Sequence, residues 1–191
     1  MSRKTTLSTF LPVLPFVIFG IWTLLMYQFT PGEIVDFFGT QNGYITTLVL
    51  SFICGISIII PIPYHLVLMT FAAGGMNPIL LGIVATIGQA TGDSTSYLLG
   101  FSGGTIASHS LFSFIQRFQK WFISLTYWKF ATALMIYGAM SPFSNDWLLI
   151  PMGIARYPYR KIMAPLEIGN LIFNIGAGVL GAYGLASILG S

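Results

Sequence analysis

Long apolar runs of membrane-spanning length constrain this chain more than any other feature. Residues 11–29, 79–100 and 162–189 each approach or exceed the roughly 20 residues that a helix needs to cross a bilayer. Charged residues make up 7% of the chain, whereas a soluble domain carries about 25%. So few charges could not cover the surface of a water-soluble globule. We therefore expect an all-α integral membrane protein that forms a single polytopic domain over residues 1–191, with residues 11–29 as an extra N-terminal spanning helix.

The composition and the spacing of reactive residues exclude several other classes of protein. Cys54 is the only cysteine, so intramolecular disulfides and thiolate metal clusters are excluded. The two histidines lack a metal-binding spacing, and neither a nucleophile–base constellation nor a phosphate-binding glycine loop with lysine is present. The net charge of +3 is too small to indicate nucleic acid. We predict no enzymatic activity, no cofactor or metal and no nucleic-acid partner. Membrane lipids are the expected partners, and assembly into a homo-oligomer stays open.

Two apolar arms are interrupted by proline and return as arms that are too short to cross a membrane. The first apolar arm is residues 44–60; it is broken at Pro61 and Pro63 and returns as residues 65–73. The second is residues 130–140; it is broken at Pro142 and returns as residues 147–155. Proline removes a backbone donor and clashes with the preceding turn, so each break ends a helix. Each pair of arms predicts a re-entrant hairpin, whose tip must be covered by protein or face a water-filled cavity. The alternative is a spanning helix followed by an interfacial stub.

Polar connectors link these apolar parts. Glu33 and Asp36 follow the first apolar run and are predicted to lie in a loop. Residues 101–129 form an amphipathic connector on the cytoplasmic side, in which Arg117 and Lys120 are set apart from aromatic residues at helical spacing. This pattern is typical of a helix that lies in the membrane interface. An ordinary amphipathic connector would have the same location.

The chain contains an internal repeat with a spacing of about 81 residues. The predicted repeats cover residues 44–100 and 130–184, and each has an apolar arm, a proline break, a short arm and a long helix. The spacing places prolines and glycines on their counterparts: Pro61 on Pro142, Gly88 on Gly169, and Gly100 on Gly181. Gly88 and Gly92 in the first long helix, and Gly169 in the second, indicate close helix packing.

The most informative matches between the repeats are polar. The same spacing places Thr86 on Glu167, Gln89 on Asn170, and Asp93 on Asn174. Because residues three or four apart share one face of a helix, these side chains form one polar stripe on each long helix. Polar groups at membrane depth are costly and are expected to face protein or a water-filled path. Hydrogen bonding between helices would explain the amides alone. A carboxylate in each stripe, beside a broken hairpin, favours a functional cavity.

The distribution of lysine and arginine predicts the orientation in the membrane. With Arg3 and Lys4 in the cytoplasm, hairpins that enter from opposite sides leave every lysine and arginine on the cytoplasmic side, as the positive-inside rule prefers. The C-terminus is then outside, and the two repeats are inverted. Counting each hairpin as two crossings gives the same distribution of charge. Inverted repeats with broken helices at mid-membrane are typical of secondary transporters. We expect a multi-pass protein of the plasma or inner membrane.

Several motifs resemble a known family. They are Pro61-Ile-Pro63, Gly74-Gly75-x-Asn77-Pro78, Gly88-x3-Gly92-Asp93-x3-Tyr97-x2-Gly100, and Ser141-Pro142-x2-Asn145-Asp146 followed by Gly153. Their order, over roughly residues 44–184, resembles the DedA family, also called the VTT or SNARE-associated Golgi protein superfamily. The resemblance implies paired re-entrant hairpins, inverted repeats and lipid transport. Bacterial members are linked to the recycling of undecaprenyl phosphate, and eukaryotic relatives to phospholipid scrambling.

The chain departs from this family at positions that bear on its substrate. Bacterial members usually carry an acidic residue directly after the first Pro-x-Pro, where this chain has Tyr64 and His65. They also carry arginines on either side of the second proline, where this chain has Ala139 and Asn145. Arginine is the natural partner of phosphate. These departures argue against undecaprenyl phosphate and against proton coupling through the family's usual acids.

Three functions follow as hypotheses, of which the first is preferred. It is a flippase- or scramblase-like transporter of a lipid or lipid-phosphate headgroup, with path residues His65, Gln89, Asp93, Asn145, Asp146, Glu167, Asn170 and Asn174. The second is a proton- or sodium-coupled transporter of small solutes that uses Asp93, Asp146 and Glu167. The third is a non-transporting membrane assembly module. Two tip residues have simpler alternatives: His65 could titrate near neutral pH or be only hydrogen bonded, and Asp146 could cap the returning arm.

Overall fold

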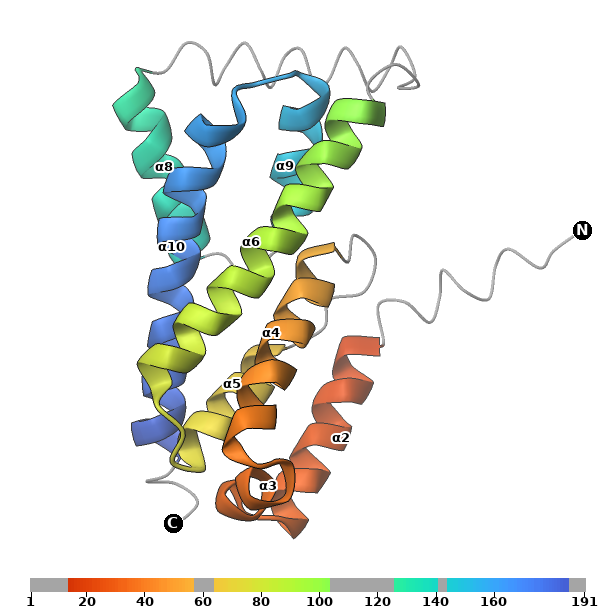
Figure 1. Ribbon diagram of the computed structural model, residues 1–191, viewed down its shortest axis with the longest axis vertical. Helices are drawn as coiled ribbons and strands as arrows, with labels where there is room; N and C mark the ends of the chain where they lie inside the picture. Colours follow the sequence, from red (N-terminus) through yellow and green to blue (C-terminus); the bar gives the residue numbers. More distant parts are fainter. Residues whose placement is uncertain (1–13, 57–63, 104–125, 141–143, 186–191) are drawn as a thin grey trace, which may run out of the picture.

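The computed structural model describes residues 14–56, 64–103, 126–140 and 144–185 (Figure 1). Within these residues the regular structure is helical and contains no strand, so the all-α prediction is confirmed. The predicted hairpin tips, with Pro61, Pro63 and Pro142, lie outside the described residues. Most of the predicted connector over residues 101–129 also lies outside them.

Among the described residues, two helices precede the first predicted repeat. Helix α2 (Leu14–Gln28) packs only loosely against the other helices. Helix α3 (Pro31–Phe38) replaces the loop predicted around Glu33 and Asp36. A capping box starts this helix: the Thr30 side chain accepts from the Glu33 backbone N–H, and the Glu33 carboxylate accepts from Thr30 N at 2.8 Å. Pro31 suits the first turn, and Gly39, at φ 74°, ends the helix.

The first unit consists of α4 (Thr40–Ile56), α5 (Tyr64–Ala73) and α6 (Pro78–Gly103). Asn77 caps the start of α6, because its side-chain oxygen accepts from the backbone N–H groups of Ile79 and Leu80 at 3.0 and 3.1 Å. Helices α4 and α6 pack closely through glycine. A Cβ at Gly92 would lie 2.6 Å from the Phe52 carbonyl oxygen, and one at Gly88 would overlap α4 as well.

The second unit consists of α8 (Tyr127–Met140), α9 (Asp146–Ile154) and α10 (Tyr159–Leu180), which continues into a π-helical turn, η1 (Gly181–Leu185). Helices α8 and α10 also pack through glycine. A Cβ at Gly138 would lie 2.6 Å from the Leu166 carbonyl oxygen, and one at Gly169 would overlap the backbone of α8. Gly88 and Gly92 therefore lie at the contact of α4 with α6, and Gly169 lies at the contact of α8 with α10.

The two long helices organise the molecule. Figure 1 shows α6 and α10 running in opposite directions and crossing, with α4 and α5 beside one half and α8 and α9 beside the other. Each long helix also reaches the short helix of the other unit. Gly100 of α6 lies against Ile150 of α9, and Gly181, directly after α10, lies against Met69 of α5. Gly181 follows Gly100 by 81 residues, and Ile150 follows Met69 by the same spacing.

Each unit has its own apolar core, completed by the other unit's long helix. The first core centres on Leu68, Phe71 and Leu81 and includes Ala177 of α10. The second core includes Phe130, Leu134, Leu148, Leu149, Met152, Ile162 and Leu166, together with Tyr97 of α6. Because each core takes a residue from the opposite unit, the two units cannot separate without opening both cores.

One helix of the described part of the chain is long and apolar enough to cross a membrane. It is Tyr159–Gly184, with 26 residues and a mean hydropathy of 1.4. Half of its most apolar stretch is buried inside the protein. Helix α6 also has 26 residues, but polar side chains interrupt its sequence, and α2 has 15 described residues.

Candidate functional site

Polar side chains of the two long helices meet where α6 and α10 cross. The two stripes predicted from sequence face each other there and are linked by hydrogen bonds. Their exposed fractions are low: 1% for Asp93, 4% for Asn170 and 0% for Asn174. The short helices α5 and α9 each add residues of their first turn to this site. The site has two parts, which we call the neutral half and the acidic half.

The neutral half comprises Tyr64, His65, Thr86, Gln89 and Asn174, with Asn174 at its centre. The Asn174 amide donates to Thr86 Oγ1 at 3.0 Å and to Gln89 Oε1 at 3.2 Å. The Tyr64 hydroxyl lies 2.8 Å from Asn174 Oδ1 and 2.9 Å from Gln89 Oε1, and can donate to either. His65 Nε2 lies 3.2 Å from the same Asn174 oxygen. This half therefore consists of uncharged groups that satisfy one another.

The acidic half comprises Asp93, Asn145, Asp146, Glu167 and Asn170, with Asp93 at its centre. Asp93 Oδ2 accepts from the Asn145 amide at 2.6 Å and from the Asn170 amide at 3.4 Å. The Asn170 amide also donates to Glu167 Oε2 at 3.1 Å, so that one amide bridges two carboxylates. Asp146 begins α9 beside Asn145 and accepts from Ser144 Oγ at 2.7 Å.

The acidic half has acceptors that its own residues leave unsatisfied. Asp146 Oδ1 and Glu167 Oε1 are buried and have no hydrogen-bond partner among the described residues. Asp146 is only 2% exposed. Within the same part of the chain, no lysine or arginine pairs with either carboxylate or with Asp93. Buried carboxylates without a cationic partner are costly, so this half can accept a proton, a cation or a hydrogen-bond donor from a ligand.

The two halves are built to one plan. The spacing of 81 relates Tyr64 to Asn145, His65 to Asp146, Thr86 to Glu167, Gln89 to Asn170, and Asp93 to Asn174. The contact of Tyr64 with Asn174 thus corresponds to that of Asn145 with Asp93. The contact of Asn174 with Gln89 corresponds to that of Asn170 with Asp93. The same arrangement occurs once with neutral groups and once with carboxylates.

Hydrogen bonds join seven of the eight predicted path residues within the two halves and add Tyr64. The eighth, Asp146, adjoins Asn145 and bonds to Ser144. Tyr64 appeared in the sequence only as a departure from a family motif, although its place 81 residues before Asn145 is a signal that could have identified it. The alternative role predicted for Asp146 is wrong. Asn145 occupies the cap position of α9, and Asp146 is the first helical residue, bonded to Ser144. His65 is hydrogen bonded within the network.

No protein-family model, no curated protein and no solved structure matches this chain. The resemblance to the DedA family therefore stays a prediction from the motifs. Among the described residues, no group of three or more histidine, cysteine, aspartate or glutamate side chains is arranged to hold a metal ion.

Proposed function

We propose that this chain is an integral membrane protein that moves a lipid headgroup between leaflets along the polar network at the crossing of α6 and α10. The observation that carries this proposal is the distribution of side chains on the long helices, which have their polar faces inside and their apolar faces outside. A helix on the surface of a water-soluble protein has the opposite distribution.

Helix α6 illustrates this inversion. Ile79, Ile83 and Ile87 follow one another at four-residue intervals on one face and are 54%, 39% and 56% exposed. Asp93 and Ser96, in contrast, are 1% and 0% exposed. Extended apolar surfaces of this kind mark contact with another apolar phase. Since α10 similarly exposes Ile168 and Ile172 while burying its amides, we attribute both outer faces to contact with lipid.

The lengths and positions of the short helices support paired re-entrant hairpins. Helices α5 and α9 have 10 and 9 residues. At 1.5 Å per residue each is about 15 Å long, half of the roughly 30 Å that a bilayer core requires. They lie in opposite halves of the molecule (Figure 1). We infer an inverted repeat of a re-entrant hairpin plus a long helix, an architecture that transporters use to bind substrate at mid-membrane.

The exposed charges support an orientation. Lys129, Arg156 and Arg160 lie at the end of the molecule where α8 begins and α9 ends, whereas Glu33 and Asp36 lie on α3 at the opposite end (Figure 1). We assign the basic end to the cytoplasm by the positive-inside rule. The protein would then be a multi-pass protein of the plasma or inner membrane.

The network offers a headgroup the hydrogen bonds that it would lose on leaving water. Its amides and hydroxyls can both donate and accept, and the carboxylates of the acidic half can only accept when ionised. The acyl chains would remain in lipid beside the exposed apolar faces. In this proposal the pseudo-symmetry matters because two similar sets of contacts, one on each side of the crossing, can receive the headgroup in turn.

The unsatisfied oxygens favour a second candidate function. Asp146 Oδ1 and Glu167 Oε1 are acceptors that a proton or sodium ion could occupy, as expected of a coupled transporter of small solutes. This candidate predicts transport that depends on pH or sodium and that loses this dependence in Asp146→Asn. The lipid proposal predicts headgroup movement in the absence of any ion gradient.

A scrambling assay tests the lipid proposal. Proteoliposomes with a fluorescent phospholipid in both leaflets are treated with an impermeant quencher, which reaches the inner-leaflet probe only if lipids cross. The wild-type protein should expose nearly all of the probe, and Asn174→Leu should slow this exposure. Ile172→Leu, on the outer face of the same helix, is the matched control and should not. Wild-type vesicles that behave like empty ones would refute the proposal.

A further inference from the structure

We propose that the pocket between α2, α3 and the first unit holds an acyl chain of a membrane phospholipid. The proposal rests on the proposed function, because it assumes that the exposed apolar faces lie in lipid. The pocket has a volume of about 600 Å³, within the range of about 300–1,000 Å³ that is usual for small-molecule sites.

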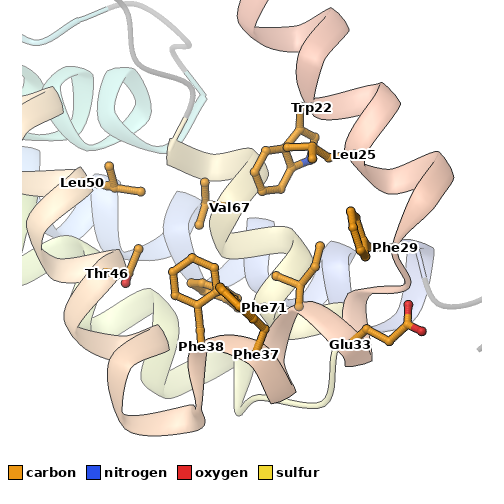
Figure 2. A pocket seen from close by; sticks show the side chains of 11 residues that line it. Trp22, Leu25, Phe29, Glu33, Phe37, Phe38, Thr46, Leu50, Val67 and Phe71 are labelled. Atoms are coloured by element: carbon orange, nitrogen blue, oxygen red, sulfur yellow. The ribbon is translucent and has the colours of Figure 1, made fainter.

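The walls of the pocket are almost entirely apolar. Figure 2 shows Trp22 and Leu25 of α2 on one side, and Leu50 of α4 with Val67 and Phe71 of α5 on the other. Three further phenylalanines and Ile34 complete the apolar lining. Such a surface offers dispersion contacts and the exclusion of water, and few hydrogen bonds. A hydrocarbon chain matches it, whereas a polar headgroup does not.

The size of the pocket favours a narrow chain over a helical partner. An α-helix with its side chains is about 10 Å or more across. A pocket of about 600 Å³ encloses a flexible hydrocarbon chain more completely than it would a helix from a second copy of this chain.

The pocket adjoins the faces that we attribute to contact with lipid. On α4, the lining residues Thr46 and Leu50 directly follow Ile45 and Val49, which are 51% and 47% exposed. On α2, Leu24 lies between two lining residues and is 69% exposed. Because α2 packs only loosely against the other helices, a chain could enter from the bilayer between α2 and α4 without passing through water.

The charges at the pocket favour a phospholipid tail over a free fatty acid. The described residues that line the pocket include no lysine or arginine, and the one charged side chain is Glu33. Its carboxylate is held in the α3 capping box by the Thr30 backbone N–H and hydroxyl. A fatty-acid carboxylate would meet no cation there and would be repelled by Glu33, whereas a phospholipid keeps its charged group outside the pocket.

Helix α5 joins the pocket to the polar network. Val67 and Phe71 line the pocket, while Tyr64 and His65 of the same short helix belong to the neutral half. From Tyr64 to Phe71 the helix rises only about 10 Å. A tail in the pocket would thus hold its lipid close to the path proposed for the headgroup.

Saturable photolabelling tests the occupant. The full chain, stripped of lipid and kept in detergent, is titrated with a phosphatidylcholine that carries a diazirine in its acyl chain, and the adducts are located by mass spectrometry. Adducts should saturate near one lipid per chain and lie on α2, α4 and α5 at the pocket. Leu50→Trp should weaken this labelling about tenfold, because the larger side chain would exclude roughly two methylene groups of the acyl chain from the pocket. Ile172→Trp, on the exposed face of α10, should leave it unchanged.

Every other outcome overturns the proposal. Labelling that does not saturate, tighter labelling by a diazirine fatty acid, or adducts joining two copies through the pocket would each identify the wrong occupant. Val67→Trp is a second filling variant if Leu50→Trp does not give a monodisperse helical protein. The scrambling assay separates the two proposals. Scrambling without pocket labelling refutes only the acyl-chain site, and labelling without scrambling refutes only the transport function.

Discussion

The neutral and acidic halves of the polar network share one geometry and differ in charge. In each, an amide or carboxyl group at the centre is hydrogen bonded to the opposite long helix and to a residue at the start of a short helix. The neutral half satisfies its own groups, and the acidic half leaves two buried oxygens without partners in the described part of the chain. The difference indicates that a ligand must displace existing hydrogen bonds in the neutral half, whereas the acidic half offers acceptors that are already free.

The largest expected effect comes from making the neutral half acidic. Asn174→Asp removes the amide donor to Thr86 and Gln89 and buries a carboxylate whose one neighbour in the neutral half able to become cationic is His65. We expect a loss of about 3–5 kcal/mol in the free energy of unfolding and a fall in Tm of about 10 °C, measured by thermal unfolding in detergent. Asn77→Asp is the matched control, since aspartate caps a helix as well as asparagine. An unchanged Tm for Asn174→Asp would show that this half tolerates charge.

The glycine contacts between the units test whether the halves are structurally equivalent. Alanine at Gly100 or Gly181 would drive a Cβ into a backbone carbonyl oxygen of the opposite short helix. Each substitution should cost about 1–3 kcal/mol, and the two costs should be similar. Gly176→Ala is the control, because a Cβ there meets nothing within 4 Å; it should be neutral or stabilising by up to about 1 kcal/mol. Clearly unequal costs at Gly100 and Gly181 would contradict the equivalence.

Removing a hydrogen-bond donor at the start of a short helix should cost more stability in the acidic half than in the neutral half. Asn145→Ala takes a hydrogen bond from a carboxylate and should cost about 2 kcal/mol, whereas Tyr64→Phe takes one from an amide and should cost about 1 kcal/mol. Chemical unfolding in mixed micelles compares the two, and Tyr183→Phe, at an exposed tyrosine, is the control. Equal costs would mean that the charge of Asp93 contributes nothing to its hydrogen bond.

The smallest effect on stability is expected from neutralising the centre of the acidic half. Asp93→Asn keeps the side-chain shape and an acceptor for Asn145. It removes a buried carboxylate that no lysine or arginine of the described residues pairs with. Stability should therefore change by less than about 1 kcal/mol, in the stabilising direction. The scrambling rate of the same variant should nevertheless fall, whereas Asp36→Asn, at an exposed site on α3, should preserve it. A clear loss of stability in Asp93→Asn would assign Asp93 a structural role.

Much of the site could be predicted from particular residues. Helical spacing placed Thr86, Gln89 and Asp93 on one face, and the spacing of 81 paired them with residues of α10. The capping box at Thr30 and Glu33 was also present in the sequence, but the loop prediction overlooked it. The pocket at Trp22 and Val67 had no sequence signal, because it depends on the distance between α2 and α5, which no local pattern specifies.

Residue types and their spacing are enough to predict a helical chain, two arms that are too short to cross a bilayer, and two long helices that each carry a polar stripe. These properties follow from residue type and spacing along one helix. Which side chains the stripes meet depends on the tertiary structure. It placed Asn174 against uncharged partners and Asp93 against other acids and amides, because the crossing of α6 and α10 and the positions of α5 and α9 determine which neighbours each buried group can reach.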